Sequence, residues 1–253
     1  MLNLDSVSVT YSTAAGDHQA LAAVDMTVEK GGSCVIIGPT GCGKTSLLFL
    51  SAGLIAPTEG RVSVGGDTLA GVRRGTSLIL QQHGLFPWKD AYANASLGLT
   101  LRNVDPREVL STTRKLMEEM GIWEIRKSLP SQLSGGQRQR VAIARSLATS
   151  PDLLLMDEPF SALDAMTRET LQDLVLALWK EWAFTFVLVT HSIEEAVFLG
   201  KKIVVMSAGP GRIAQVVDNR AMGDHGFRLT GPFHEKCTEL RRLMEHTRQE
   251  NPA

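Results

Sequence analysis

The stretch Cys34-Val-Ile-Ile-Gly38-Pro-Thr-Gly-Cys-Gly-Lys44-Thr45-Ser46 decides the fold of this 253-residue chain. Its apolar beginning is a continuous run rather than an alternating one, which is typical of a strand buried on both faces of a parallel sheet. A glycine-rich turn follows, and we predict a helix over residues 44–53 after it. A strand, a glycine-rich turn and a helix in that order predict an α/β fold whose turn can hold a phosphate group.

The turn matches the pattern GxxxxGK[ST], in which each residue type has a chemical reason. Glycines let the backbone turn sharply and aim N–H groups at phosphate oxygens, and the positive end of the following helix adds to the attraction. We expect Lys44 to reach the β- and γ-phosphates of a nucleotide and the hydroxyl of Thr45 to bind Mg²⁺. The predicted nucleotide contacts of this segment are Gly38, Pro39, Thr40, Gly41, Cys42, Gly43, Lys44, Thr45 and Ser46.

The rest of the chain fits the same fold class. Continuous apolar runs at Leu153–Met156 and Phe186–Val189 predict two more strands of a covered parallel sheet. Alternating apolar and polar residues predict half-exposed antiparallel strands, at 2–11, Val24–Val28 and Arg61–Val64. Further helices are predicted around residues 106–120, 135–149, 165–182 and 192–199. We therefore predict an α/β fold with a parallel-sheet core, an antiparallel β layer near the N-terminus and a helical insertion.

The order of these segments suggests domain boundaries. Residues from about 83 to 150 hold no clear strand, so we predict a helical subdomain between core strands. Ile203–Met206 and Ile213–Val217, joined through Ala-Gly-Pro-Gly, are expected to form a closing hairpin. The main domain is thus expected over residues 1–217. A helical tail is expected over 218–253, where apolar residues recur at helical spacing, namely Phe233, Cys237, Leu240 and Met244.

Composition argues against several classes of protein. Charged residues make up 21% of the chain and its formal net charge is −1, which argues against a nucleic-acid surface. No apolar stretch approaches the ~20 residues that span a bilayer, and the N-terminus lacks the layout of a secretion signal. The 3 cysteines show no metal-ligand spacing. We expect a cytosolic chain that reaches a membrane only through a partner.

Two acids end the strand predicted at Leu153–Met156. Asp157 and Glu158 are expected to continue that strand as its last two residues, and the carboxyl edge of a parallel sheet is where such sheets bind their ligands. Asp157 suits the shell of a Mg²⁺ ion, and Glu158 could accept a proton from an attacking water. The alternative interpretation is a solvated strand end.

Residues 134–137, Ser-Gly-Gly-Gln, predict a helix start. Ser134 and Gln137 form an S-x-x-Q capping box. The same segment offers free N–H groups, a hydroxyl and two glycines that permit close approach, which together suit a γ-phosphate. Capping and phosphate binding do not compete, so we expect both.

These motifs together resemble those of ABC ATPases. Leu133-Ser-Gly-Gly-Gln137 lies between the phosphate loop and Asp157-Glu-Pro-Phe-Ser-Ala-Leu-Asp164, which looks like that family's Walker B motif and D-loop. The resemblance implies the P-loop NTPase fold, ATP with Mg²⁺ as cofactors, and hydrolysis. It also implies a homodimer, in which Ser134, Gly135, Gly136 and Gln137 close on the ATP of the second copy.

The family pattern assigns roles to residues outside these motifs. His191, after the strand at 186–190, matches the switch histidine that contacts the γ-phosphate. Gln81 matches the glutamine that touches Mg²⁺ or the water, although the adjacent Gln82 leaves this choice open. Tyr11 matches the aromatic that stacks on adenine, or else it only packs. Asp164 belongs to the nucleotide site through the D-loop.

The resemblance also implies partners. It is strongest to importers of nitrate, sulfonate, taurine and related solutes, on the segments Leu-Phe-Pro-Trp, Asp-Glu-Pro-Phe and Ser-Ala-Gly-Pro-Gly-Arg-Ile. Such a subunit lies at the cytoplasmic face of the membrane, bound to transmembrane permease subunits and served indirectly by a solute-binding protein. Phe86 and Trp88 are candidate permease contacts, or else pack within their loop. The rival functions are a soluble ABC ATPase acting on nucleic acid or ribosomes and a non-hydrolytic nucleotide sensor.

Overall fold

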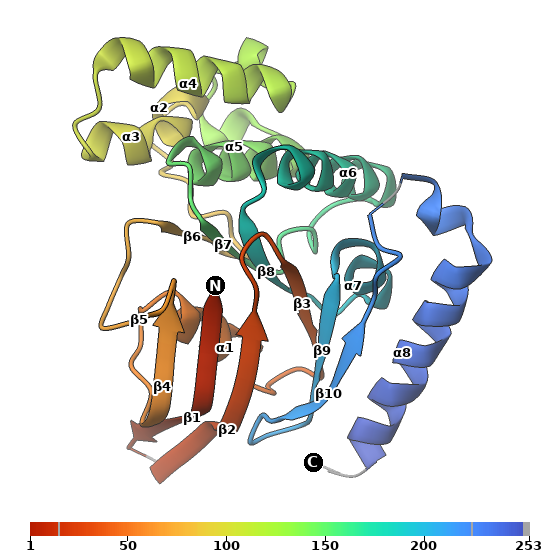
Figure 1. Ribbon diagram of the computed structural model, residues 1–253. Coiled ribbons are helices and arrows are strands. Elements are labelled where there is room, and N and C mark those ends of the chain that lie inside the picture. The colour runs from red at the N-terminus through yellow and green to blue at the C-terminus, as the bar shows by residue number, and fades with distance from the viewer. Residues whose placement is uncertain (15, 224, 250–253) are drawn as a thin grey trace.

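The computed structural model of the protein describes residues 1–14, 16–223 and 225–249, and it contains two sheets (Figure 1). The larger sheet has six strands in the order β10-β9-β3-β8-β7-β6. β9, β3, β8, β7 and β6 run parallel to one another, and β10 pairs antiparallel with β9 at the edge. The bounds are β3 Ser33–Ile37, β6 Thr76–Ile79, β7 Leu153–Asp157, β8 Thr185–Val189, β9 Lys202–Met206 and β10 Ile213–Asp218. This is the predicted parallel core with its closing hairpin.

The second sheet is antiparallel and has the order β2-β1-β4-β5. Its strands are β1 Leu2–Thr13, β2 Gly16–Val28, β4 Glu59–Val64 and β5 Asp67–Thr68. β2 begins well before the predicted Val24. The alternating pattern does not mark its first part, because residues 16–19 are all exposed and residues 20–22 are all buried. Pairing of Tyr11 with His18 places that extension beside the end of β1.

The continuous apolar run of β3 is explained by two separate cores. Val35 and Ile37 pack in the core under the helices, whereas Cys34 and Ile36 pack in the core between the two sheets. Helix α1 (Lys44–Ser51) lies in this second core, where Leu47 and Leu48 are fully buried. Because both faces of β3 are covered, the loop after it is held from two sides.

A layer of helices lies between β6 and β7 in the chain and is set apart from the sheets in Figure 1. It contains α2 Ala91–Ala95, α3 Leu97–Leu101, α4 Pro106–Glu119, α5 Gly135–Ala148 and the short 3-10 helices Trp123–Ile125 and Pro130–Gln132. The bounds of α4 and α5 agree with the predicted helices to within a residue or two. α2 and α3 were not predicted individually, because each is too short for a helical apolar period to be visible.

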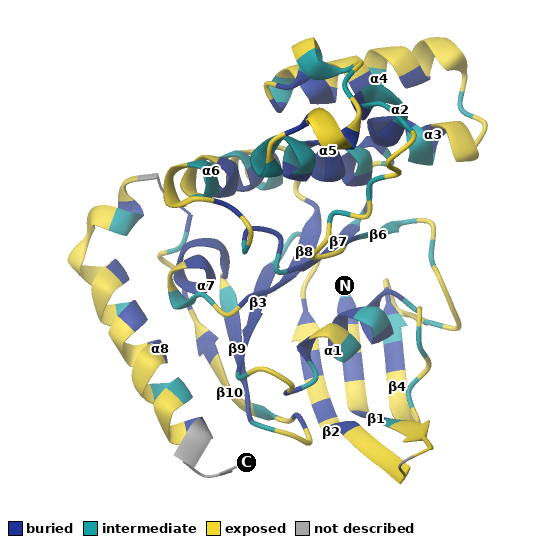
Figure 2. Cartoon of the chain, turned by 180° about the vertical axis from the view of Figure 1, so that it is seen from behind, coloured by how far each residue is buried: buried dark blue, intermediate teal, exposed yellow. Residues whose placement is uncertain are grey.

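Three further helices lie in the same core as the helical layer, on the face of the large sheet away from the antiparallel sheet: α6 Ala165–Trp182, α7 Ile193–Leu199 and α8 Gly231–Gln249. α8 lies against α7, and its buried residues Phe233, Cys237 and Leu240 face inward while the opposite side is exposed (Figure 2). These are residues of the predicted stripe. Residues 224 and 250–253 of the predicted tail lie outside the described residues. In the described part, no helix has the length and apolar character to cross a bilayer.

Candidate active site

The phosphate loop is held in place by its own lysine. The ammonium of Lys44 donates to the carbonyl oxygens of Gly38 and Pro39 at 2.9 and 2.7 Å. Lys44 is the first residue of α1 and is 8% exposed. Its ammonium group therefore lies within the phosphate loop and not out in solvent. The positive end of α1 and this ammonium favour an anion at the same place.

Gly43 shows why the loop needs glycine. It is the N-cap of α1, with φ of 87°, and a Cβ built there would stand 2.6 Å from the carbonyl oxygen of Ala20. A side chain would therefore meet both a left-handed backbone and a clash with β2. The close contact fixes the loop against the antiparallel sheet.

The side chain of Cys42 packs in an apolar core. Its side chain is fully buried among apolar residues between the two sheets, and its Sγ lies 3.6 Å from the Lys44 ammonium. Burial raises the pKa of this thiol. Of the predicted contacts, Cys42 can therefore serve a nucleotide only through its backbone.

Two oxygen groups meet beside the loop. The hydroxyl of Thr45 donates to Asp157 Oδ2 at 3.1 Å. Asp157 ends β7 and is 7% exposed, and burial raises the pKa of its carboxyl although the hydrogen bond from Thr45 opposes that effect. A hydroxyl and a carboxylate in contact are the kind of oxygen ligands that Mg²⁺ takes.

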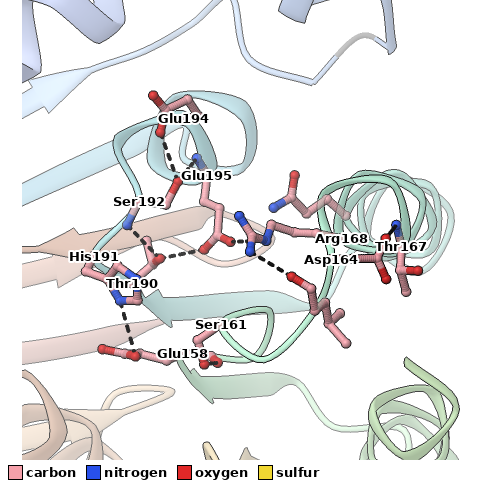
Figure 3. Close-up of polar contacts among 12 residues, drawn as sticks. Glu158, Ser161, Asp164, Thr167, Arg168, Thr190, His191, Ser192, Glu194 and Glu195 are labelled. Carbon is pink, nitrogen blue, oxygen red and sulfur yellow. Dashed lines mark hydrogen bonds and ion pairs between the residues drawn. The ribbon is translucent and has the colours of Figure 1, made fainter. Parts of the chain in front are cut away.

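Glu158 receives two contacts on one oxygen. Gln81 Nε2 donates to Glu158 Oε2 at 3.3 Å. His191 Nδ1 lies 3.2 Å from the same atom, as Figure 3 shows. Gln82 makes no such contact in the described part of the chain. The structure thus brings Gln81, Glu158 and His191 together from three separate strand ends.

The position of Glu158 differs from the sequence interpretation in one respect. Glu158 was expected to continue the strand, but β7 ends at Asp157 and Glu158 has a left-handed backbone with φ of 44°. Its N–H donates to the carbonyl of Val189 at 2.9 Å. The strand therefore ends one residue before the carboxylate that Gln81 and His191 contact, and strained backbone of this kind recurs at functional sites.

Tyr11 of β1 contacts Ser46 of α1, with the tyrosine hydroxyl donating to Ser46 Oγ at 3.0 Å. Tyr11 is 37% exposed, so its ring has a free face. His18 lies beside it, opposite Tyr11 in the β1–β2 pairing. Sequence reasoning missed His18. The signal was available only through the register of the hairpin, since no motif contains this residue.

These groups line one open cavity of about 670 Å³. The cavity has the size of a site for a nucleotide. Its lining includes Tyr11, His18, Ala20, Thr40, Gly41, Gly43, Lys44, Thr45, Ser46, Gln81, Glu158 and His191. Among the described residues, the other predicted site residues do not line it: Gly38, Pro39, Cys42, Ser134, Gly135, Gly136, Gln137, Asp157 and Asp164.

Ser134–Gln137 form the predicted capping box at the start of α5. The Ser134 hydroxyl accepts from the N–H of Gln137 at 3.2 Å, and the N–H of Ser134 donates to Gln137 Oε1 at 2.9 Å. Ser134 is exposed, and its helix start is separate from the chain's own cavity.

The D-loop is packed against this helix start. Asp164 caps α6 by accepting from the N–H of Thr167 at 3.0 Å, and that hydrogen bond lowers the pKa of the Asp164 carboxyl. A Cβ built at Gly136 would stand 2.7 Å from the methyl group of Thr167. Gly136 therefore permits a close approach within the chain, besides any approach to a phosphate, whereas a Cβ at Gly135 would meet nothing nearer than 3.8 Å.

The segment that follows Gln81 is tied to the helical layer. Arg145 of α5 donates to the carbonyls of His83 and Gly84 at 2.7 and 2.6 Å. Buried Asn94 of α2 accepts from the N–H of Phe86 at 2.8 Å and donates to its carbonyl at 3.1 Å. Trp88 packs on Phe86 with ring centroids 5.3 Å apart, and it remains 71% exposed.

Comparisons with known proteins agree with this geometry. A family model described as "ABC transporter" matches residues 21–161. The "Taurine import ATP-binding protein TauB" of Escherichia coli strain K12 is 42% identical over 215 residues, which are 85% of this chain and 83% of that protein. The protein of the same name from Roseobacter denitrificans is 41% identical over 213 residues, 84% of this chain and 80% of that protein.

Solved structures give the same result for the fold. The dimeric structure of "a post-hydrolysis state of the ATP-binding cassette MJ0796 bound to ADP and Pi" has a TM-score of 0.79 and 30% identity, and the match covers 87% of this chain and 99% of that one. A second structure is described as "Dimeric Structure of MJ0796, a Bacterial ABC Transporter Cassette", and it matches with the same TM-score, identity and coverage.

Proposed function

The chain belongs to the ABC transporter family, and on that premise we propose that it hydrolyses ATP to drive import of taurine or a related small sulfonate through separate permease subunits. The relatives are import proteins and are matched over at least 80% of their length. This disfavours the rival function on nucleic acid or ribosomes. Intact Glu158 and His191 disfavour a non-hydrolytic sensor.

The observation that carries hydrolysis is the convergence of Gln81 and His191 on one oxygen of Glu158, inside the cavity of the phosphate loop. Glu158 is the base: it takes a proton from water as the water oxygen bonds to the γ-phosphorus and the bond from that phosphorus to the bridging oxygen breaks. Gln81 and His191 hold the carboxylate and the water in line. The positive charge of Lys44 offsets charge on the phosphates.

The residues present fit Mg²⁺. Thr45 and Asp157 offer a hydroxyl and a buried carboxylate 3.1 Å apart, next to the ammonium that would hold the phosphates. Gln81 lines the same cavity and can add its amide oxygen. Bound there, Mg²⁺ would neutralise phosphate charge.

The active form is a dimer with two composite sites. Ser134–Gln137 form a capped helix start with free N–H groups, separate from their own chain's cavity, and the similar structures of MJ0796 are dimeric. Each segment closes on the γ-phosphate held by the second copy's phosphate loop. Loss of that phosphate removes the contact, so the dimer reopens.

The permease contact includes Phe86 and Trp88. Trp88 is exposed although it is large and apolar, and it lies seven positions after Gln81 on a segment tied to α5 and α2. Movement at the nucleotide thereby reaches the membrane subunits, which place this chain at the cytoplasmic face. A solute-binding protein delivers the solute to the permease from the opposite side.

The reaction is tested with purified protein, ATP and Mg²⁺. Wild type should release phosphate, and Glu158→Gln should bind ATP, lose turnover by at least about 100-fold and accumulate as a dimer. Turnover of Glu158→Gln at the parent rate would rule out Glu158 as the base.

The partner is tested by co-purification from membranes and by taurine-stimulated ATP turnover of the complex. Trp88→Ala should keep the ATPase activity of the isolated subunit and weaken its recovery with the permease. Equal recovery of both proteins would contradict a permease contact at Trp88. Turnover that no sulfonate stimulates would contradict the proposed solute class.

A further inference from the structure

A buried carboxylate outside the cavity links two parts of the active site. Glu195 lies on α7 and is 4% exposed, which is unusual for an ionisable side chain. It is absent from the cavity lining, so it does not touch the nucleotide directly. Its two oxygens face two different loops (Figure 3).

One oxygen of Glu195 is bound to the loop of the switch histidine. Thr190, which is 2% exposed, donates its hydroxyl to Glu195 Oε2, and the same hydroxyl accepts from the N–H of Ser192 at 3.0 Å. Ser192 Oγ accepts from the N–H of Glu195 at 3.2 Å. The residues on both sides of His191 are thus fixed by one cluster, whose anchor is the buried carboxylate.

The other oxygen faces the D-loop through an arginine. Arg168 Nε lies 3.9 Å from Glu195 Oε1, and Arg168 Nη2 donates to the carbonyl of Leu163 at 2.8 Å. Leu163 precedes Asp164, the D-loop cap of α6. Arg168 Nε is buried and has no hydrogen-bond partner in the described part of the chain. A shift of about 1 Å would turn the long Arg168–Glu195 contact into a hydrogen bond.

From these contacts we propose that Glu195 is a positioning residue that holds His191 against Glu158 and couples that geometry to the D-loop through Arg168. This inference rests on the proposed function, because it assigns a support to the same hydrolytic site. Figure 3 shows the path: the Glu158–His191 contact on one side, and Thr190, Glu195, Arg168 and the carbonyl next to Asp164 on the other. D-loop movement at the dimer interface thereby changes the position of the switch histidine.

The physical reason is preorganisation. His191 is 65% exposed on its side chain, so few packing contacts restrain its ring. Its orientation depends on the backbone of residues 190–192, which the cluster fixes. Residues that orient a catalytic group through hydrogen bonds typically change activity by about 10- to 100-fold when they are replaced.

The experiment compares kcat and KM for ATP in four single variants of the full chain. Glu195→Gln and Thr190→Val should each lower kcat by about tenfold while KM changes by less than about twofold. Thr190→Ser keeps the hydroxyl and should restore most of the rate. Glu169→Gln removes an exposed charge next to Arg168 and should leave kcat at the parent value. Should Thr190→Val fail to fold, Glu195→Gln and Thr190→Ser still decide the outcome.

A background of His191→Ala separates positioning from general structural damage. In single-turnover assays, Glu195→Gln should cause no further loss of rate in that background, because the group it positions is gone. Additive losses would overturn the proposal, as would an unchanged kcat in the single variant. A parent that hydrolyses no ATP would contradict the proposed function. A large loss in His191→Ala with none in Glu195→Gln contradicts only this inference.

Discussion

Substitutions of Ser134 can separate an effect on folding stability from an effect on dimer assembly. Its hydroxyl caps α5, and in the proposed dimer the same hydroxyl contacts the second copy's γ-phosphate. Asp caps helices about as well as Ser, whereas Ala loses about 1 kcal/mol. In a chain of this size, that loss lowers the melting temperature by about 2–4 °C. We therefore expect Ser134→Ala to be destabilised and Ser134→Asp to match the parent.

Dimer affinity should rank Ser134→Ala and Ser134→Asp in the opposite order. A carboxylate at position 134 would stand next to a phosphate, and two like charges ~4 Å apart at an effective dielectric constant of about 20 repel by about 4 kcal/mol. That is about a thousandfold in affinity at each of the two sites. Ser134→Ala loses only one hydrogen bond per site, about 1 kcal/mol. The more stable variant should therefore be the one that cannot dimerise.

The assay uses Glu158→Gln as the background so that ATP persists. Thermal unfolding without nucleotide gives the stability of each variant, and analytical ultracentrifugation with ATP and Mg²⁺ gives the dimer fraction. An Asp variant that dimerises as the background does would refute the contact with the phosphate. An Ala variant with unchanged melting temperature would refute the energetic importance of the cap.

Two further predictions concern backbone geometry and pH. Gly43→Ala should weaken ATP binding and lower the melting temperature more than Gly41→Ala does. Both glycines have φ near 80°, but only a Cβ at Gly43 meets the Ala20 carbonyl. Equal effects of the two substitutions, measured by calorimetry and thermal melts, would contradict the steric argument. Burial raises the pKa of Glu195, against the effects of Thr190, Arg168 and His191. The folded state therefore holds a proton that the unfolded state releases, so stability falls as pH rises from the ordinary glutamate pKa to the raised one. Urea melts from about pH 4 to pH 8 should show Glu195→Gln gaining stability relative to the parent with rising pH, and a constant difference would contradict this.

Much of the fold was visible in the sequence because local patterns and tertiary burial agree. Cys34–Ile37 is apolar at every position since each of its faces packs in a different core. The capping box of Ser134 and Gln137 is a local interaction, and it forms as its spacing predicts. The extension of β2 was missed because residues 16–19 are all exposed and residues 20–22 are all buried, so no alternation marks them.

The site was less accessible to sequence reasoning where it depends on contacts between distant segments. Motifs identified Glu158. They did not show that β7 ends at Asp157, or that Glu158 itself has a backbone with positive φ. The register of β1 with β2 brings His18 to the cavity, and nothing in the local sequence distinguishes it. Glu195 is an ordinary acidic residue of a helix until folding buries it beside Thr190.

The hydrogen bonds that Arg145 and Asn94 make to the loop after Gln81 have a mechanical consequence. Each anchor is a helix side chain that binds main-chain atoms of the loop, and Asn94 holds both the N–H and the carbonyl of Phe86. We therefore expect the loop to move together with the helices α2 and α5. In the proposed transporter, this joint movement would carry a displacement at the nucleotide to the permease. Loosening either anchor should then let ATP be consumed with less movement of the permease.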